Sequence, residues 1–355
     1  MNKTAIKNSI SRLFKIVKKM VLFLFITIVL AIVVYFTISF VNNYYSKKDY
    51  ENKKQEYLNL LTMNTDDLFG ISNVEGLIFN PEAYRMFENA CLGNSNSNLL
   101  SNGSFSKKDG IICQSINNTV LIVNGIETII SEEPSSFINI IGDDVYFRND
   151  VNRALYKYTI STGNTECIVS KNCGEVVVSS KGISFIDFTT SHLKYIPFNT
   201  MKIETVAEIP IQSFTVVGMD YLCLTVEKDL GILSGQTFNI LDSNVDRFFY
   251  QGTIAIQKGD AIYVLKDGKV IEKTIQNVDG ILVNYNGDKL FVKSNSSIDI
   301  YDLNIDSDSQ ILTYVAEEDV VKSFCILNDL SEMILYNKTD TLYSATHQTN
   351  PIKEE

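Results

Sequence analysis

The chain has 355 residues and a formal net charge of −11, from 31 Lys and Arg against 42 Asp and Glu. Six of the basic residues lie in the first 19 positions, so the remaining 25 face all 42 acidic residues and the rest of the chain carries about −17. This balance argues against nucleic acid as a partner, because nucleic-acid binding needs a basic face. It would also repel an anionic membrane surface.

An uninterrupted apolar run without charge occupies residues 20–41. As a helix rising about 1.5 Å per residue it would measure roughly 33 Å, enough to cross a hydrocarbon core of roughly 30 Å. Residues 1–19 are rich in lysine and contain no Asp or Glu. Because positive charge stays on the cytoplasmic side, we expect a cytoplasmic tail at 1–19, a transmembrane helix at 20–41 and an extracytoplasmic remainder.

The alternative is a cleaved signal peptide, which has a shorter apolar core and a small-residue cleavage site. Here Asn42, Asn43, Tyr44 and Tyr45 follow the run, without an A-x-A pattern. The sequence therefore favours an uncleaved signal anchor. Residues 42–65 are charged and predict a short stalk, because they cannot supply the sustained heptads of a coiled coil.

One helix is well marked, at 81–92, with Asn80 as N-cap, Pro81 in the first turn and Gly93 just past the end. Tyr84, Phe87 and Cys91 fall on one stripe, which we expect to pack on the neighbouring domain.

From about Asn94 onward, short runs rich in Ile, Val, Tyr and Phe alternate with Gly, Asn, Asp and Ser, a pattern typical of all-β proteins. Seven apolar runs each follow a turn signal, with starts roughly 33 to 43 residues apart. They are 111–115, 145–149, 183–187, 221–226, 253–257, 289–293 and 333–337.

Most of these runs have a further apolar strand on each side, and some units have a fourth, such as 166–170. Four antiparallel strands in about 40 residues predict a β-propeller blade. We therefore expect one all-β domain, a β-propeller over 66–355, with seven blades, or with six or eight. Residues 76–80 (GLIFN) could supply the strand that closes the last blade.

The segment DVYFRN (144–149), followed by ALYKY (154–158) and Ser161-Thr162-Gly163, resembles the YWTD-type repeat of low-density-lipoprotein-receptor propellers. It is also similar to propeller repeats in surface proteins of unknown function from low-GC Gram-positive bacteria. The likeness extends over about 110–345 but is clear in one or two units. It departs from the motif, because the chain has no Trp and Asn149 replaces the Asp. The resemblance implies a propeller and does not imply a ligand.

The sequence identifies no catalytic, cofactor-binding or metal-binding residue. His192 and His347 are its only histidines, and sialidase-like boxes are absent. Residues 306–317 have a calcium-loop spacing, but Ile311 stands where glycine is needed, so a solvated loop is favoured. Among six cysteines, Cys167 and Cys173 are close enough to be considered for a disulfide, whereas Cys113, Cys223 and Cys325 read as buried thiols.

Two classes of function follow. The favoured one is a noncatalytic extracellular binding or scaffold module, held at the cell membrane by residues 20–41, for a protein or a cell-wall polymer. The alternative is a surface hydrolase or lyase with carboxylates at the propeller channel. Tyr146, Tyr156, Tyr158 and Tyr195 could form a binding face, although core packing is the favoured interpretation for strand aromatics.

Overall fold

The computed structural model describes residues 81–218, 220–266, 269–284, 287–294 and 297–304, and the strands at 312–315, 321–327, 332–337 and 342–344. The chain divides into two compact units, Met1–Leu60 and Leu61–Glu355, and all the described residues belong to the second. The expected tail, membrane helix, stalk and 76–80 strand lie outside the described residues, as do residues 306–311 and 316–317 of the calcium-like loop. No helix within the described ranges is long and apolar enough to cross a membrane.

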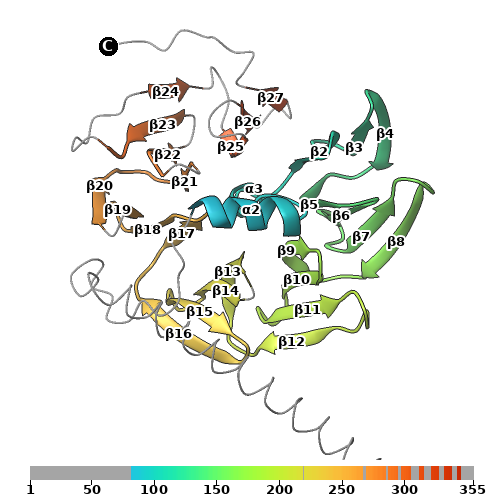
Figure 1. Cartoon of the computed structure of the whole chain (residues 1–355), viewed down its shortest axis with the longest axis horizontal. Helices are drawn as coiled ribbons and strands as arrows, with labels where there is room; N and C mark the ends of the chain where they lie inside the picture. Colours follow the sequence, from blue (N-terminus) through green and yellow to red (C-terminus); the bar gives the residue numbers. More distant parts are fainter. Residues whose placement is uncertain are drawn as a thin grey trace, which may run out of the picture. The chain divides into compact units, whose positions relative to one another are not determined.

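The described residues form seven antiparallel sheets (Figure 1). In each sheet the strands pair in chain order or its reverse, so every sheet is a meander of neighbouring hairpins. The first four sheets are β1 (Phe105–Lys108), β2 (Ile111–Ser115), β3 (Thr119–Val123) and β4 (Ile126–Ser131); β5 (Ser135–Ile141), β6 (Asp144–Asn149), β7 (Leu155–Thr159) and β8 (Asn164–Val169); β9 (Cys173–Ser179), β10 (Gly182–Asp187), β11 (Leu193–Pro197) and β12 (Glu204–Ala207); and β13 (Ile211–Val217), β14 (Asp220–Thr225), β15 (Leu230–Ser234) and β16 (Thr237–Asp242).

The remaining three sheets complete the series. They are β17 (Arg247–Tyr250), β18 (Ile254–Lys258), β19 (Ala261–Lys266) and β20 (Lys269–Thr274); β21 (Gly280–Val283), β22 (Lys289–Lys293), β23 (Ser297–Asp302) and β24 (Leu312–Val315); and the three strands β25 (Val321–Leu327), β26 (Glu332–Asn337) and β27 (Leu342–Ser344).

Each of the seven predicted apolar runs overlaps the second strand of a sheet, so the all-β prediction is confirmed. Burial falls across a sheet: six of the seven residues of β5 are buried, whereas the first four residues of β8 are exposed. A first strand covered on both faces needs a nearly continuous apolar run, which explains sequences such as VVVS in β9. The first strands of successive sheets also contact one another, for example β5 with β9 and β17 with β21.

The turn chemistry agrees with the sequence at the hairpin between β1 and β2. Asp109 and Gly110 have φ angles of 50° and 79°, the two positive values that a type I′ turn requires. Such a turn matches the twist of the flanking strands, and it sets the register in which Lys108 faces Ile111.

The predicted helix is present as α2 (Pro81–Cys91). Its apolar stripe is packed as expected, because Tyr84 is 6% exposed and its ring meets that of Tyr250 at a centroid distance of 4.8 Å. Phe87 packs partly buried between two apolar clusters.

A second helix, α3 (Asn96–Leu100), was not expected from the sequence, which predicts β texture from Asn94 onward. Ser95 caps it by accepting a hydrogen bond from the Asn98 backbone N–H at 3.2 Å. Helix α3 begins within the polar segment 94–98 (NSNSN), whose composition is typical of a solvated loop. The segment is nevertheless buried, because Asn96 is 0% and Asn98 1% exposed.

The buried segment 94–98 lies among first strands of several sheets. Helix α3 contacts β9, β13, β17 and β25, and Figure 1 shows α2 and α3 amid the sheets. The Asn94 side chain donates to the carbonyl oxygens of Phe105 at 2.8 Å and Ile138 at 2.6 Å. Asn96 donates to the Val216 carbonyl at 2.9 Å. The segment therefore links β1, β5 and β13 through side-chain hydrogen bonds.

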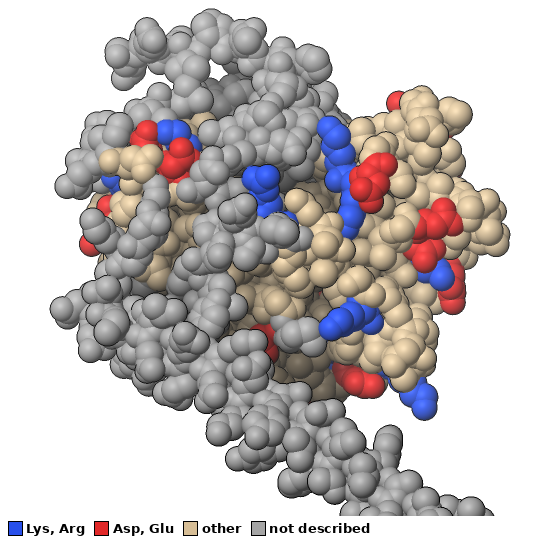
Figure 2. All heavy atoms as spheres, in the orientation of Figure 1, with Lys and Arg blue, Asp and Glu red and all other residues tan. Residues whose placement is uncertain are grey.

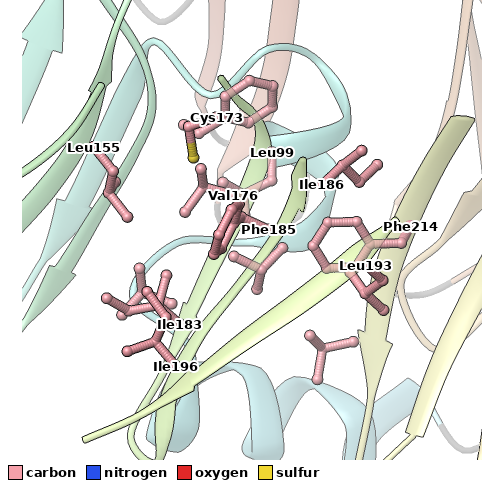
Figure 3. Packing of buried hydrophobic residues seen from close by; sticks show 14 of the residues in the cluster. Leu99, Leu155, Cys173, Val176, Ile183, Phe185, Ile186, Leu193, Ile196 and Phe214 are labelled. Carbon is pink, nitrogen blue, oxygen red and sulfur yellow. The ribbon is translucent and has the colours of Figure 1, made fainter. Parts of the chain in front are cut away.

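Apolar contacts supplement these hydrogen bonds. Leu99 of α3 belongs to the same buried cluster as Val176 of β9 and Phe185 of β10. Figure 3 shows Leu99 beside Val176 and Cys173, with Leu193 of β11 and Phe214 of β13 farther along the cluster. Leu99 thus ties α3 into the apolar packing between sheets.

The disulfide that the sequence left open is not formed, because Cys167 and Cys173 are both free. Cys167 is exposed on β8, the last strand of one sheet, whereas Cys173 is buried on β9, the first strand of the next. The two residues thus belong to opposite edges of adjacent sheets despite their short separation in sequence. Cys113 and Cys223 are buried thiols, as expected.

Two glycines test the tight fit after α3. A Cβ added to Gly103 (φ +55°) would lie 2.8 Å from the Phe137 Cα, whereas one added to Gly110 (φ +79°) would meet nothing within 4 Å. Gly110→Ala should lose about 1 kcal/mol of unfolding free energy, from the positive φ alone. Gly103→Ala should lose roughly a further 1–3 kcal/mol of unfolding free energy, because the added Cβ would force the backbone at Phe137 to move.

Urea unfolding of the full-length protein in detergent, followed by circular dichroism, measures both values. Equal losses in the two variants would show that the contact between residues 103 and 137 is not tight.

Candidate functional site

A cavity of about 360 Å³ lies where α3 ends among the first strands of several sheets. We call it the α3 cavity. Its walls come from α3 and the residues after it, from the starts of β5, β9, β13, β17 and β21, and from the end of β22. Its lining includes Leu99, Asn102, Phe137, Glu175, Gln212, Ser213, Arg247, Asp279 and Lys293.

A break in strand register recurs at the starts of three of these strands. The pairing shifts between Ser136 and Asn139 in β5, around Glu175 in β9, and between Ile211 and Ser213 in β13. A bulge leaves residues outside the ladder and re-aims their side chains. Phe137, Glu175 and Gln212 occupy these breaks and all line the α3 cavity.

Glu175 is held at the wall by one carboxylate oxygen. Its Oε2 accepts hydrogen bonds from the Ser213 hydroxyl at 3.0 Å and from the Phe214 backbone N–H at 3.1 Å. Burial raises the pKa of Glu175 to about 7, and these two bonds and the charge of Arg148 offset only part of that rise. The pKa of Glu175 therefore lies close to neutral pH.

Arg148 itself is engaged beside the cavity. It donates to Asp150 at 2.7 Å and to the Gly174 carbonyl at 3.2 Å, and its guanidinium lies 4.6 Å from the centre of the Phe137 ring. The cation thus fixes the backbone next to Glu175 and the ring of another lining residue.

Arg247 and Lys293 bring two positive charges to the lining of the α3 cavity. Burial is the main cause that lowers the pKa of each, and Arg247 lowers that of Lys293 further by repulsion. The Nη1 atom of Arg247 is buried and, within the described part of the chain, has no hydrogen-bond partner. The Lys293 ammonium lies 3.8 Å from Asp279 Oδ2, beyond hydrogen-bond distance.

The third carboxylate of the lining, Asp246, is already neutralised. It accepts from the Lys228 ammonium at 2.6 Å and from the Gly259 N–H at 2.7 Å. The Lys228 bond is the main reason that the pKa of Asp246 is lowered.

On the face shown in Figure 2, acidic and basic side chains are interspersed, without one dominant patch of either sign.

The residues singled out by sequence lie elsewhere. His192 is partly exposed between β10 and β11. Tyr146 is 5% exposed and stacks on Phe198, and Tyr156 stacks on Phe147, so these two pack as core aromatics. Tyr158 is a partly buried member of the same packing. Tyr195 is partly buried on β11, and His347 lies outside the described residues.

Sequence reasoning missed the α3 cavity because its charged residues come from three sheets and share no motif. A usable signal was present in the repeat: Arg247 begins β17, Asp279 immediately precedes β21, and Glu175 stands just before the apolar run VVV of β9. Charges at equivalent ends of strands that surround one centre must approach one another. The described residues contain no group of three His, Cys, Asp or Glu that could hold a metal ion.

The raised pKa of Glu175 predicts a pH-dependent stability. Below about pH 4.5 both the folded and unfolded states hold the proton; between pH 4.5 and 7 the unfolded state releases it while the folded state keeps it. Stability should therefore fall as pH rises across this window, by on the order of 2 kcal/mol, somewhat below the full shift because Glu175 keeps contact with the cavity.

Urea unfolding of the full-length protein at pH 5 and pH 8 measures this slope. Glu175→Gln should lose that part of the slope, whereas Glu204→Gln, at an exposed position of β12, should keep it. An unchanged slope in Glu175→Gln would contradict the assignment.

Comparison with known proteins identifies a fold and no family. No protein family and no curated protein matches the sequence. A chain of the mitotic checkpoint complex matches with a TM-score of 0.51 and 9% identity, over 71% of this chain and 87% of that one. Hsv2 of Kluyveromyces lactis matches with a TM-score of 0.42 and 12% identity, over 57% and 70%.

The computationally designed protein Ika8 matches with a TM-score of 0.45 and 9% identity, over 72% of this chain and 98% of its own. The mitotic checkpoint chain and Hsv2 are proteins of the WD40 or β-propeller type. The similarity to the mitotic checkpoint chain supports a β-propeller fold, in agreement with the prediction from the repeats.

Proposed function

We propose that this protein is a membrane-anchored β-propeller, closed and seven-bladed, that acts outside the cell as a noncatalytic binding or scaffold module. Residues 20–41 would anchor it, and the ligand would be a protein or a cell-envelope polymer. The seven sheets and the contacts between successive first strands support the ring. The partial likeness to YWTD-type repeats is compatible with this architecture.

The observation that carries the binding function is the α3 cavity. It places a buried guanidinium nitrogen, which has no hydrogen-bond partner among the residues that the structure describes, beside polar side chains from several sheets. A buried donor is costly unless a partner satisfies it, so such a position favours a bound acceptor. Concave sites with a few converging polar groups are the usual ligand sites of proteins.

A surface hydrolase or lyase is the second candidate, and one observation favours it. Glu175 has a pKa of about 7 and could donate a proton at neutral pH. A two-carboxylate mechanism would also need an available partner. Asp246 is bonded to Lys228 and Asp279 is paired with Lys293, so the binding function is better supported.

Retention of an envelope component tests the binding function. Immobilised full-length protein in detergent should retain a protein or wall polymer from envelope extracts, and Arg247→Ala should reduce retention at least fivefold. Arg153→Ala is the matched control, because Arg153 lies over the ring of the exposed Phe188 and does not line the α3 cavity. Equal retention by both variants, or none by the unmodified protein, would contradict the proposal.

The predicted orientation can be tested with Cys167, which is exposed and free. A membrane-impermeant maleimide should label the full-length protein on intact cells of a single-membrane host, and Cys167→Ser should lose most of that label. Burial raises the pKa of Cys173 to about 12, so its thiol should not react in the folded state. Labelling only after lysis would place the domain inside the cell.

A further inference from the structure

We propose that the α3 cavity binds an oxyanion, a carboxylate or phosphate group of the ligand, between Arg247 and Lys293. This inference rests on the proposed binding function and names the chemical group that the cavity takes. It concerns two cations supplied by neighbouring sheets, Arg247 from the start of β17 and Lys293 from the end of β22.

The backbone places both cations at corresponding ends of their sheets. Arg247 pairs with Gln257 at the start of β17, and Gly280, at the start of β21, pairs with Lys293. The first strands β17 and β21 contact each other, so these pairs are neighbours. Both side chains line the α3 cavity.

Neither cation is fully matched by the protein. Lys293 has an ion pair with Asp279 at 3.8 Å, and its side chain is only 12% exposed. The buried Nη1 of Arg247 has no hydrogen-bond partner among the described residues. An oxyanion is the complementary group, because a guanidinium donates two parallel hydrogen bonds to a carboxylate or phosphate.

The carboxylates of the lining leave room for an added negative charge. Asp246 is paired with Lys228, so Arg247 and Lys293 share Asp279 as the one lining aspartate that is not already paired with another cation. Glu175 is held by Ser213 and Phe214, and its proton removes its charge for part of the time at neutral pH. Gln212 and Asn102 complete the lining with amide groups that can donate to ligand oxygens.

Calorimetry on the full-length protein in nanodiscs tests the site, with inorganic phosphate and acetate as separate probes. Saturable binding of either is expected, and the tighter probe identifies the source of the oxyanion. Arg247→Gln and Lys293→Gln should each weaken binding by about tenfold or more, the effect of losing one charge-assisted bond. Arg153→Gln, which removes a cation outside the cavity, should bind as tightly as the unmodified protein.

A pH series on the unmodified protein provides a second measurement. Acetate keeps its charge between pH 6 and pH 8, so its binding should tighten as Glu175 gains a proton, and Glu175→Gln should flatten this dependence. The other groups facing Glu175 are Arg148 of β6 and Cys223 of β14, and the charged lining consists of Asp246, Arg247, Asp279 and Lys293.

Three outcomes would overturn the inference: neither probe binds, Arg247→Gln in its folded form binds as well as the unmodified protein, or binding is independent of pH. If envelope retention still depends on Arg247 while neither probe binds, the binding function stands and the oxyanion assignment fails. If neither retention nor anion binding is seen, both fail.

Discussion

Hydrogen bonding of the buried segment 94–98 is the constraint on which the described structure depends. An amide side chain without partners in the interior costs on the order of 1–3 kcal/mol, so each buried asparagine must find partners there. The partners belong to different elements: Asn94 reaches β1 and β5, and Asn96 reaches β13. Glu88 of α2 joins them by accepting from the Asn96 backbone N–H at 2.6 Å and from Gln251 at 3.0 Å. The sheets are thereby tied to one central segment.

The same centre explains the position of the α3 cavity. Side chains from several first strands converge there, and α3 ends within the same group of strands. Breaks in strand register at Phe137, Glu175 and Gln212 place these three residues at the α3 cavity. In a regular strand ladder their side chains would point in other directions. Burial beside the cavity raises the pKa of Glu175 and lowers the pKa values of Arg247 and Lys293, because each side chain loses contact with bulk water.

The strands were predictable because each one satisfies a local rule. Apolar β-branched runs follow turn residues at a regular interval, and Asp109-Gly110 supplies the dihedral angles that its hairpin requires. The segment 94–98 was not predictable, because Asn and Ser are typical of solvated loops. Its hydrogen-bond partners lie 11, 44 and 120 residues away. The pairing of Cys167 with Cys173 was also not decided by local sequence. The two cysteines are only six residues apart in the chain but lie on different sheets.

By itself, the sequence determined the all-β class, the length of the repeat, the identity of the second strands and the helix that begins at Pro81. These follow from periodicity and turn chemistry, which act over a few residues. Tertiary structure alone decided that NSNSN is buried and that Glu175, Arg247, Asp279 and Lys293 share one cavity. Their meeting depends on how successive sheets are arranged around α3, and no local preference of the chain encodes that arrangement.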